Sequence, residues 1–66
     1  MPSTATTAQL QALLDRLQAE QRALIANAAR IAMMPSDGTI RRISDLENSI
    51  AAVEALMHEQ RPGEGK

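Results

Sequence analysis

The 66-residue sequence contains no cysteine, phenylalanine, tryptophan or tyrosine, and its only histidine is His58. Without cysteine no disulfide can form, and a structural zinc site is implausible with one imidazole and no thiolate. The missing aromatic rings leave no platform on which the bases of a single-stranded nucleic acid could stack. A chain this short buries a smaller fraction of its surface than larger domains do. Association with another chain is therefore the stabilising device that remains.

An excess of charge of either sign is also lacking. Seven Lys and Arg residues stand against eight Asp and Glu residues, for a net charge of -1, so there is no electrostatic case for nucleic-acid or membrane-surface binding. The N-terminus has neither the basic region nor the apolar run of a secretion signal. The longest apolar-leaning stretch, residues 23–34, is too short for a membrane span and contains Asn27 and Arg30. We therefore expect a soluble, unprocessed, cytoplasmic protein.

Aliphatic residues at helical spacing fill the first half of the sequence. A helix is expected to begin near Thr6, because Thr6 and Gln9 have the spacing of a capping box, and to continue to about Met33. Its apolar positions fall on a stripe about 120° wide, which is broader than a single neighbouring helix covers. The stripe comprises Leu10, Leu13, Leu14, Leu17, Leu24, Ile25, Ala28, Ile31 and Ala32.

A break follows at residues 34–38, where Pro35 disfavours helical geometry at Met34, and where Ser36, Asp37 and Gly38 favour a turn and a helix cap. A second helix is expected over residues 39–60. Its apolar residues alternate three and four positions apart, as in a coiled-coil seam. The seam comprises Ile43, Leu46, Ile50, Val53 and Met57, with Ile40 and Leu56 on opposite flanks. Residues 1–5 and 61–66 are expected to be flexible ends.

Two helices joined by about five residues become antiparallel neighbours. The expected fold class is therefore all-α, an antiparallel helical hairpin, and two hairpins are expected to pair into a homodimeric four-helix bundle. A trimeric or tetrameric coiled coil and a heteromeric bundle remain alternatives, and the pattern does not choose between parallel and antiparallel dimers. The predicted interface comprises Leu10, Leu13, Leu14, Leu17, Gln21, Leu24, Ile25, Ala28, Ile31, Ile40, Ile43, Leu46, Ile50, Val53, Leu56 and Met57.

Gln21 is the one polar residue within the apolar stripe of the first helix. An unpaired amide at such a position costs about 1 to 3 kcal/mol, so a hydrogen-bond partner is expected, such as its symmetry mate or a backbone carbonyl. A polar layer that sets the register of the bundle is one interpretation. The other is that the amide reaches the edge of the bundle near a small neighbouring residue.

Arg41 and Arg42 form the clearest charge anomaly, because two cations near the start of a helix oppose the positive end of its dipole. Asp37 and Asp45 are expected to compensate them, with Arg41 and Asp45 as an i, i+4 pair. Together with Arg30 they form a candidate basic tip, and Met33 and Met34 add flexible thioethers beside it. This tip either contacts a protein partner or an anion, or is a solvated, ion-paired end of the bundle.

No motif typical of catalysis, metal binding or nucleotide binding occurs. Glu54 and His58 are four residues apart but lack the further ligands of a metal site. We therefore expect no enzyme and no cofactor, and interpret the chain as a protein-binding adaptor, regulator or assembly factor. The alternatives are a hairpin chaperone of a secretion or assembly apparatus, whose bundle a different chain completes, and a nucleic-acid-binding regulator that uses Arg30, Arg41 and Arg42.

Overall fold

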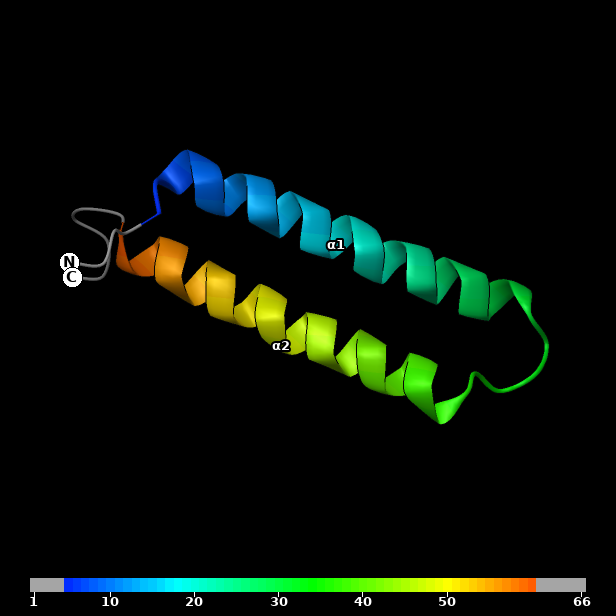
Figure 1. The fold of residues 1–66 in the computed structure, drawn as a ribbon. Helices are drawn as coiled ribbons and strands as arrows, with labels where there is room; N and C mark the ends of the chain where they lie inside the picture. Colours follow the sequence, from blue (N-terminus) through cyan, green and yellow to red (C-terminus); the bar gives the residue numbers. More distant parts are fainter. Residues whose placement is uncertain (1–4, 61–66) are drawn as a thin grey trace.

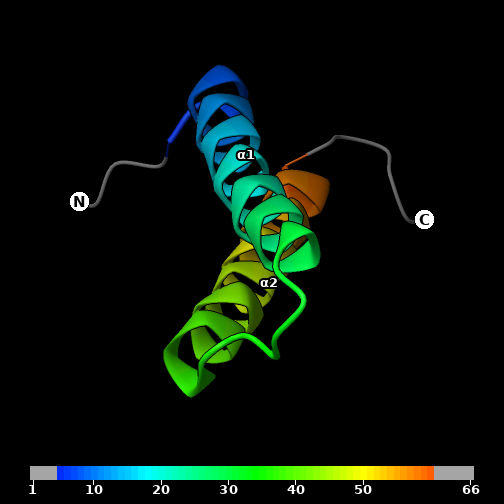
Figure 2. The same cartoon turned by 90° about the vertical axis from the view of Figure 1, so that its right-hand side faces the viewer.

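The computed structural model describes residues 5–60 and shows two α-helices that pack side by side. Helix α1 comprises Thr7–Arg30, and helix α2 comprises Asp37–Glu59. The chain reverses between them, so α1 and α2 form an antiparallel hairpin (Figure 1). The view from the connection shows that the two helices are inclined to each other (Figure 2). The predicted all-α hairpin is confirmed. The predicted flexible ends fall almost entirely outside the described residues.

The start of α1 is a capping box, as predicted. The Gln9 backbone N–H donates to Thr6 Oγ1 at 3.0 Å, and the Thr6 backbone N–H donates to Gln9 Oε1 at 2.9 Å. Each side chain thereby satisfies a backbone donor that the first helical turn leaves without a partner. At the far end of the hairpin, the Gln60 amide donates to the Ala5 carbonyl at 3.3 Å, which ties the end of α2 to the start of α1.

The helix ends around the connection differ from those predicted. Helix α1 ends at Arg30 rather than Met33, because Ile31 adopts an extended backbone (φ -101, ψ 129) that directs the chain toward α2. Helix α2 begins at Asp37 rather than residue 39, because the Ser36 hydroxyl accepts the Thr39 backbone N–H at 3.1 Å and caps it. The connection therefore comprises residues 31–36 instead of 34–38.

The core is confined to one part of the hairpin. Leu10 and Leu14 of α1 and Leu46 and Ile50 of α2 are the buried hydrophobic residues among those described. Three polar contacts between the two arms of the hairpin join residues whose numbers add to 62, 65 and 68. Residues whose numbers add to about 65 therefore lie at about the same height along the hairpin. We call residues 20–45 the turn half, and residues 5–19 and 46–60 the terminal half. All four core residues lie in the terminal half.

Candidate interaction surface

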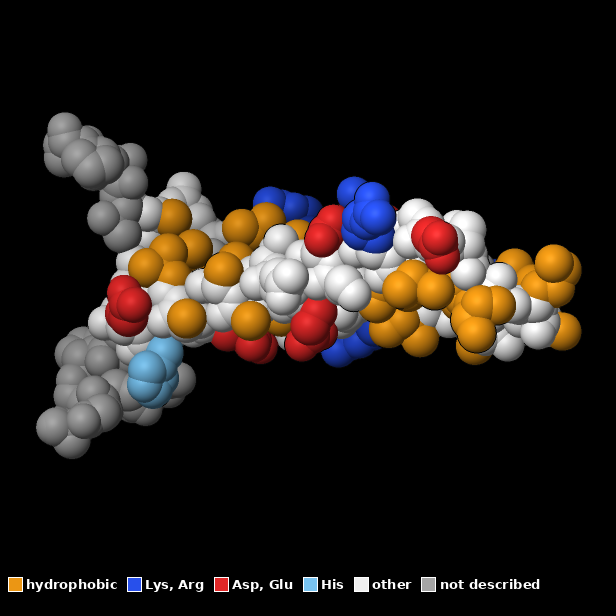
Figure 3. All heavy atoms as spheres, turned by 90° about the horizontal axis from the view of Figure 1, so that it is seen from below, with side chains coloured by type: hydrophobic (Ala, Val, Ile, Leu, Met, Phe, Trp, Pro, Cys, Tyr) orange, Lys and Arg blue, Asp and Glu red, His pale blue; other side chains and the backbone are white. Residues whose placement is uncertain are grey.

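The turn half exposes most of the large apolar side chains that α1 and α2 leave uncovered. Exposed residues there are Ile25, Ile31, Met33, Met34 and Ile40, whereas Leu56 is the corresponding residue described in the terminal half. Figure 3 shows hydrophobic side chains gathered at the connection end, on the right. Met33 and Met34 are 76% and 82% exposed, which leaves nearly all of their apolar surface in water. The turn half therefore has an apolar surface without a core beneath it.

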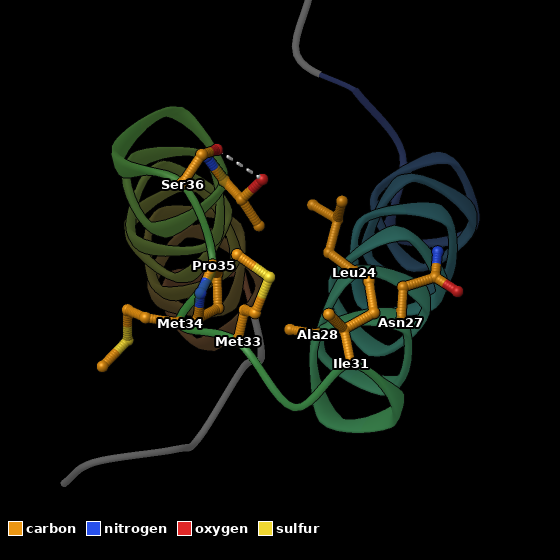
Figure 4. Close-up of a pocket in the computed structure, with 9 residues that line it drawn as sticks. Leu24, Asn27, Ala28, Ile31, Met33, Met34, Pro35 and Ser36 are labelled. Atoms are coloured by element: carbon orange, nitrogen blue, oxygen red, sulfur yellow. Dashed lines mark hydrogen bonds between the residues drawn. The ribbon is translucent and has the colours of Figure 1, made fainter.

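A pocket of about 350 Å³ opens at this end of the hairpin. Leu24 and Ala28 of α1 and Ile31 of the connection line it, together with further residues of α1, the connection and the first turn of α2. The Met33 side chain lies between the helices, whereas Met34 points away from them (Figure 4). The pocket exists because the chain leaves the helix at Ile31 and crosses to α2 without filling the space between the helix ends. Its remaining lining residues are Asn27, Met34, Pro35, Ser36 and Thr39.

Two polar links between the helices define two faces of the hairpin. Arg42 of α2 lies 3.8 Å from the Glu20 carboxylate of α1, and the two side chains are 61% and 50% exposed. Such an exposed pair contributes only about 0 to 1 kcal/mol to the free energy of unfolding. It does identify which side of α1 and which side of α2 lie on the same face of the hairpin. Leu13 and Leu24 share the side of α1 on which Glu20 lies, and Leu56 shares the side of α2 on which Arg42 lies, as the helical period requires. We call this the salt-bridge face.

The opposite face is marked by the second link. Gln21 Nε2 donates to Glu47 Oε1 at 2.8 Å. Ile25 follows Gln21 by four residues and Ile40 precedes Glu47 by seven, so both isoleucines lie on this side of their helices. Their residue numbers also add to 65, which places them at one height. We call this the amide face; its exposed apolar pair lies in the turn half.

Gln21 has a partner in its own chain. The predicted candidates were a symmetry mate or a backbone carbonyl, but the acceptor is the Glu47 carboxylate. Gln21 is half-buried and Glu47 is exposed, so the amide reaches across the helix–helix groove toward solvent. A neutral amide bonded to a carboxylate satisfies the polar group without a second copy of the chain.

The candidate basic tip is partly engaged within the hairpin. Arg42 pairs with Glu20, and the Arg30 guanidinium donates to the Asn27 side-chain oxygen. Because α2 begins at Asp37, Arg41 and Arg42 lie in its second turn, and the acidic side chain Asp37 occupies the first turn. The repulsion from the helix dipole is therefore weaker than the sequence indicated, since this effect fades beyond the first turn. Within residues 5–60 the structure shows Arg42–Glu20 as its salt bridge, not the predicted Arg41–Asp45 pair.

The predicted interface residues divide into three groups by burial. Four are the core residues, and four, Ile25, Ile31, Ile40 and Leu56, are exposed. The other eight, Leu13, Leu17, Gln21, Leu24, Ala28, Ile43, Val53 and Met57, are half-buried. All five residues of the predicted tip, Arg30, Met33, Met34, Arg41 and Arg42, are exposed. The half-buried side chains along both helices show that each helix covers only part of the apolar stripe of the other.

A smaller recess of about 270 Å³ lies in the terminal half, where Glu54 and His58 border it together with Leu14 and Met57. In the part of the chain from residue 5 to residue 60, no group of three or more His, Cys, Asp or Glu residues is placed to hold a metal ion. Neither α1 nor α2 is long and apolar enough to cross a membrane.

Sequence reasoning missed the residues that complete the pocket and the polar links. Pro35 and Thr39 line the pocket, although the sequence indicated only a helix break and a helix start there. Glu20 and Glu47, which the sequence pattern did not single out, connect the helices. The signal for the pocket was present in part, since Leu24, Ala28 and Ile31 follow the helical period toward the connection.

Comparison with protein-family models, with curated proteins and with solved structures gives no match to this chain.

Proposed function

We propose that this protein is a non-enzymatic interaction module that works as a homodimer, in which two hairpins form a four-helix bundle. One observation carries the proposal. Among residues 5–60, the buried residues all lie in the terminal half, whereas five of the six exposed large apolar side chains lie in the turn half. Most of the stability of a helix in a protein comes from the packing of its apolar face. A second hairpin over the turn half supplies that packing.

The role of the dimer, in this proposal, is to bind another protein as an adaptor, regulator or assembly factor. Support comes from apolar surface that one hairpin partner does not cover. Ile25 and Ile40 lie on the amide face, and Met34 points away from both helices. An exposed apolar group surrounded by polar side chains is typical of protein-binding surfaces, and the flexible thioether of methionine adapts to partners of different shape.

A hairpin chaperone is the second candidate, in which a different chain completes the bundle. The exposed turn half supports it equally, because the same apolar surface accepts helices of another protein. The two candidates differ in the behaviour of the chain alone. The homodimer is helical by itself, whereas a chaperone of this kind gains helicity and solubility only with its partner.

Sedimentation velocity with circular dichroism, over about a hundredfold range of concentration, tests the proposal. A helical species of twice the 7.1 kDa chain mass is expected. A poorly helical monomer that becomes helical on co-expression with another protein supports the chaperone instead. A helical monomer that melts cooperatively and independently of concentration contradicts both.

A further inference from the structure

Charge is distributed unevenly along the hairpin. The turn half contains Arg22, Arg30, Arg41 and Arg42 against three carboxylates, for a net charge of +1, and the terminal half contains Arg16 against four, for a net charge of -3 with His58 neutral. The carboxylates are Glu20, Asp37 and Asp45 in the turn half and Asp15, Glu47, Glu54 and Glu59 in the terminal half. An antiparallel pair of hairpins brings unlike net charges together, whereas a parallel pair brings like charges together.

On the salt-bridge face, the pocket and an exposed leucine lie at matching distances on either side of the middle of the hairpin. The middle of the hairpin lies at the height of residue 19, and the α1 wall of the pocket is centred near residue 28, about nine residues away. Leu56 lies at the height of residue 9, about ten residues from the middle in the opposite direction. Both features occupy the same face. A two-fold axis that lies in the plane of this face, perpendicular to the helices and at their middle, therefore brings Leu56 of a second copy to the height of the pocket.

The amide face is a poorer surface for the same operation. There the two-fold axis brings Glu54, which lies seven residues after Glu47 and on the same side of α2, toward the exposed pair Ile25 and Ile40. A carboxylate against two isoleucines loses hydration without gaining a partner. On the salt-bridge face, Glu20 and Arg42 lie near the axis and have each other as partners.

We propose that the second copy docks in antiparallel orientation on the salt-bridge face, with Leu56 of each copy in the connection-end pocket of the other. This inference rests on the proposed homodimer and names its interface and orientation. The parallel dimer also joins apolar surface at the connection end, but it collects eight arginines there. The antiparallel dimer covers the same pocket with Leu56 and pairs the arginine-rich half with the acidic half.

Spin labels on introduced cysteines distinguish the two orientations, because the natural sequence has no cysteine. Ala8 and Ala29 are exposed and lie off the salt-bridge face, near opposite ends of α1. Each lies about ten residues from the middle, or about 15 Å along the axis. In the antiparallel dimer, A29C–A29C and A8C–A8C pairs are therefore separated by about 30 Å along the axis, and the mixed A8C–A29C pair is at nearly equal height.

Pulsed electron paramagnetic resonance on the dimer is expected to give long distances for the matched pairs and a short distance for the mixed pair. Short matched distances with a long mixed distance overturn the antiparallel arrangement but leave the homodimer standing. Absence of any dipolar signal, with a monomer in sedimentation, overturns the homodimer and this inference with it.

A pair of substitutions tests the choice of face. Leu56→Ala is expected to weaken dimerisation about tenfold or more, since the side chain is removed at both symmetric contacts. Ile40→Ala is the matched control, because Ile40 is 43% exposed against 38% for Leu56 and lies on the opposite face. Equal losses of affinity for both variants, or a loss for Ile40→Ala alone, overturn the proposed face.

Discussion

Gln21 Nε2 donates a hydrogen bond of 2.8 Å to Glu47 Oε1 across the two helices. A double-mutant cycle of Gln21→Ala and Glu47→Ala is expected to give a coupling of about 0.5 to 1 kcal/mol in the free energy of unfolding, because the bond is charge-assisted but open to water. Denaturant titration of the four proteins measures it. A coupling of zero would mean that the two side chains do not interact in solution.

The capping box at the start of α1 predicts a loss of stability when its hydroxyl is removed. Thr6→Ala is expected to lower the free energy of unfolding by about 1 kcal/mol, because the Gln9 backbone N–H loses its acceptor. Thr7→Ala is the control, since Thr7 is exposed and occupies the first helical position, where alanine is at least as favourable. Thermal melts that fall equally for both variants would contradict the capping role of Thr6.

Replacing Gly38 with alanine is expected to stabilise the protein. Gly38 lies in the first turn of α2, and an added Cβ meets Ser36 Oγ at 3.9 Å as its nearest atom, which is ordinary contact. Gly38→Ala is therefore expected to raise the free energy of unfolding by about 0.5 to 1 kcal/mol. Ser36→Ala is expected to lower it by about 1 kcal/mol, since it removes the cap of the same helix. A stability loss in Gly38→Ala would show that residue 38 is not helical.

Because the core lies in the terminal half, truncating a side chain there is expected to cost more stability than truncating one in the turn half. Leu46→Ala is expected to destabilise the protein by about 2 to 5 kcal/mol, because Leu46 is 7% exposed and its loss opens a cavity between the helices. Met34→Ala is expected to change stability by no more than about 0.5 kcal/mol, since its side chain contacts mainly water. Urea denaturation measures both. Similar costs for the two variants would contradict the position of the core.

The antiparallel dimer predicts opposite responses to one change of charge. Arg41→Glu makes the turn half acidic and is expected to weaken dimerisation severalfold, whereas Arg16→Glu makes the terminal half more acidic and is expected to leave affinity unchanged or raise it. Added salt is expected to reduce the difference between the variants. Equilibrium sedimentation at low and high salt measures it, and a larger loss for Arg16→Glu would favour the parallel dimer.

The sequence predicts the fold because its signals are local. Thr6 and Gln9 define the start of α1 through contacts three residues apart, and the helical period of the leucines identifies which side faces α2. The end of α1 is not encoded so locally. The apolar pattern continues past Arg30 because Ile31 and Met33 line the pocket, where their backbone is no longer helical.

The polar contacts between the helices were beyond sequence reasoning for a physical reason. To predict the pairing of Gln21 with Glu47, one must know the axial register of the two helices and the angle between them. The period of one helix contains neither. The same holds for Glu20 and Arg42. The stripe width correctly indicated that apolar surface stays uncovered, and the structure adds that this surface is concentrated in the turn half.

Amide hydrogen exchange of the turn half at two concentrations, about a hundredfold apart, tests most directly whether a second copy completes the hairpin. If a second copy completes the hairpin, backbone amides of residues 22–30 and 39–45 are weakly protected in dilute solution and gain protection as the dimer forms. The amides around Leu14 and Ile50 are expected to be protected more strongly at the lower concentration. Protection of the turn half that is high and independent of concentration would contradict the homodimer.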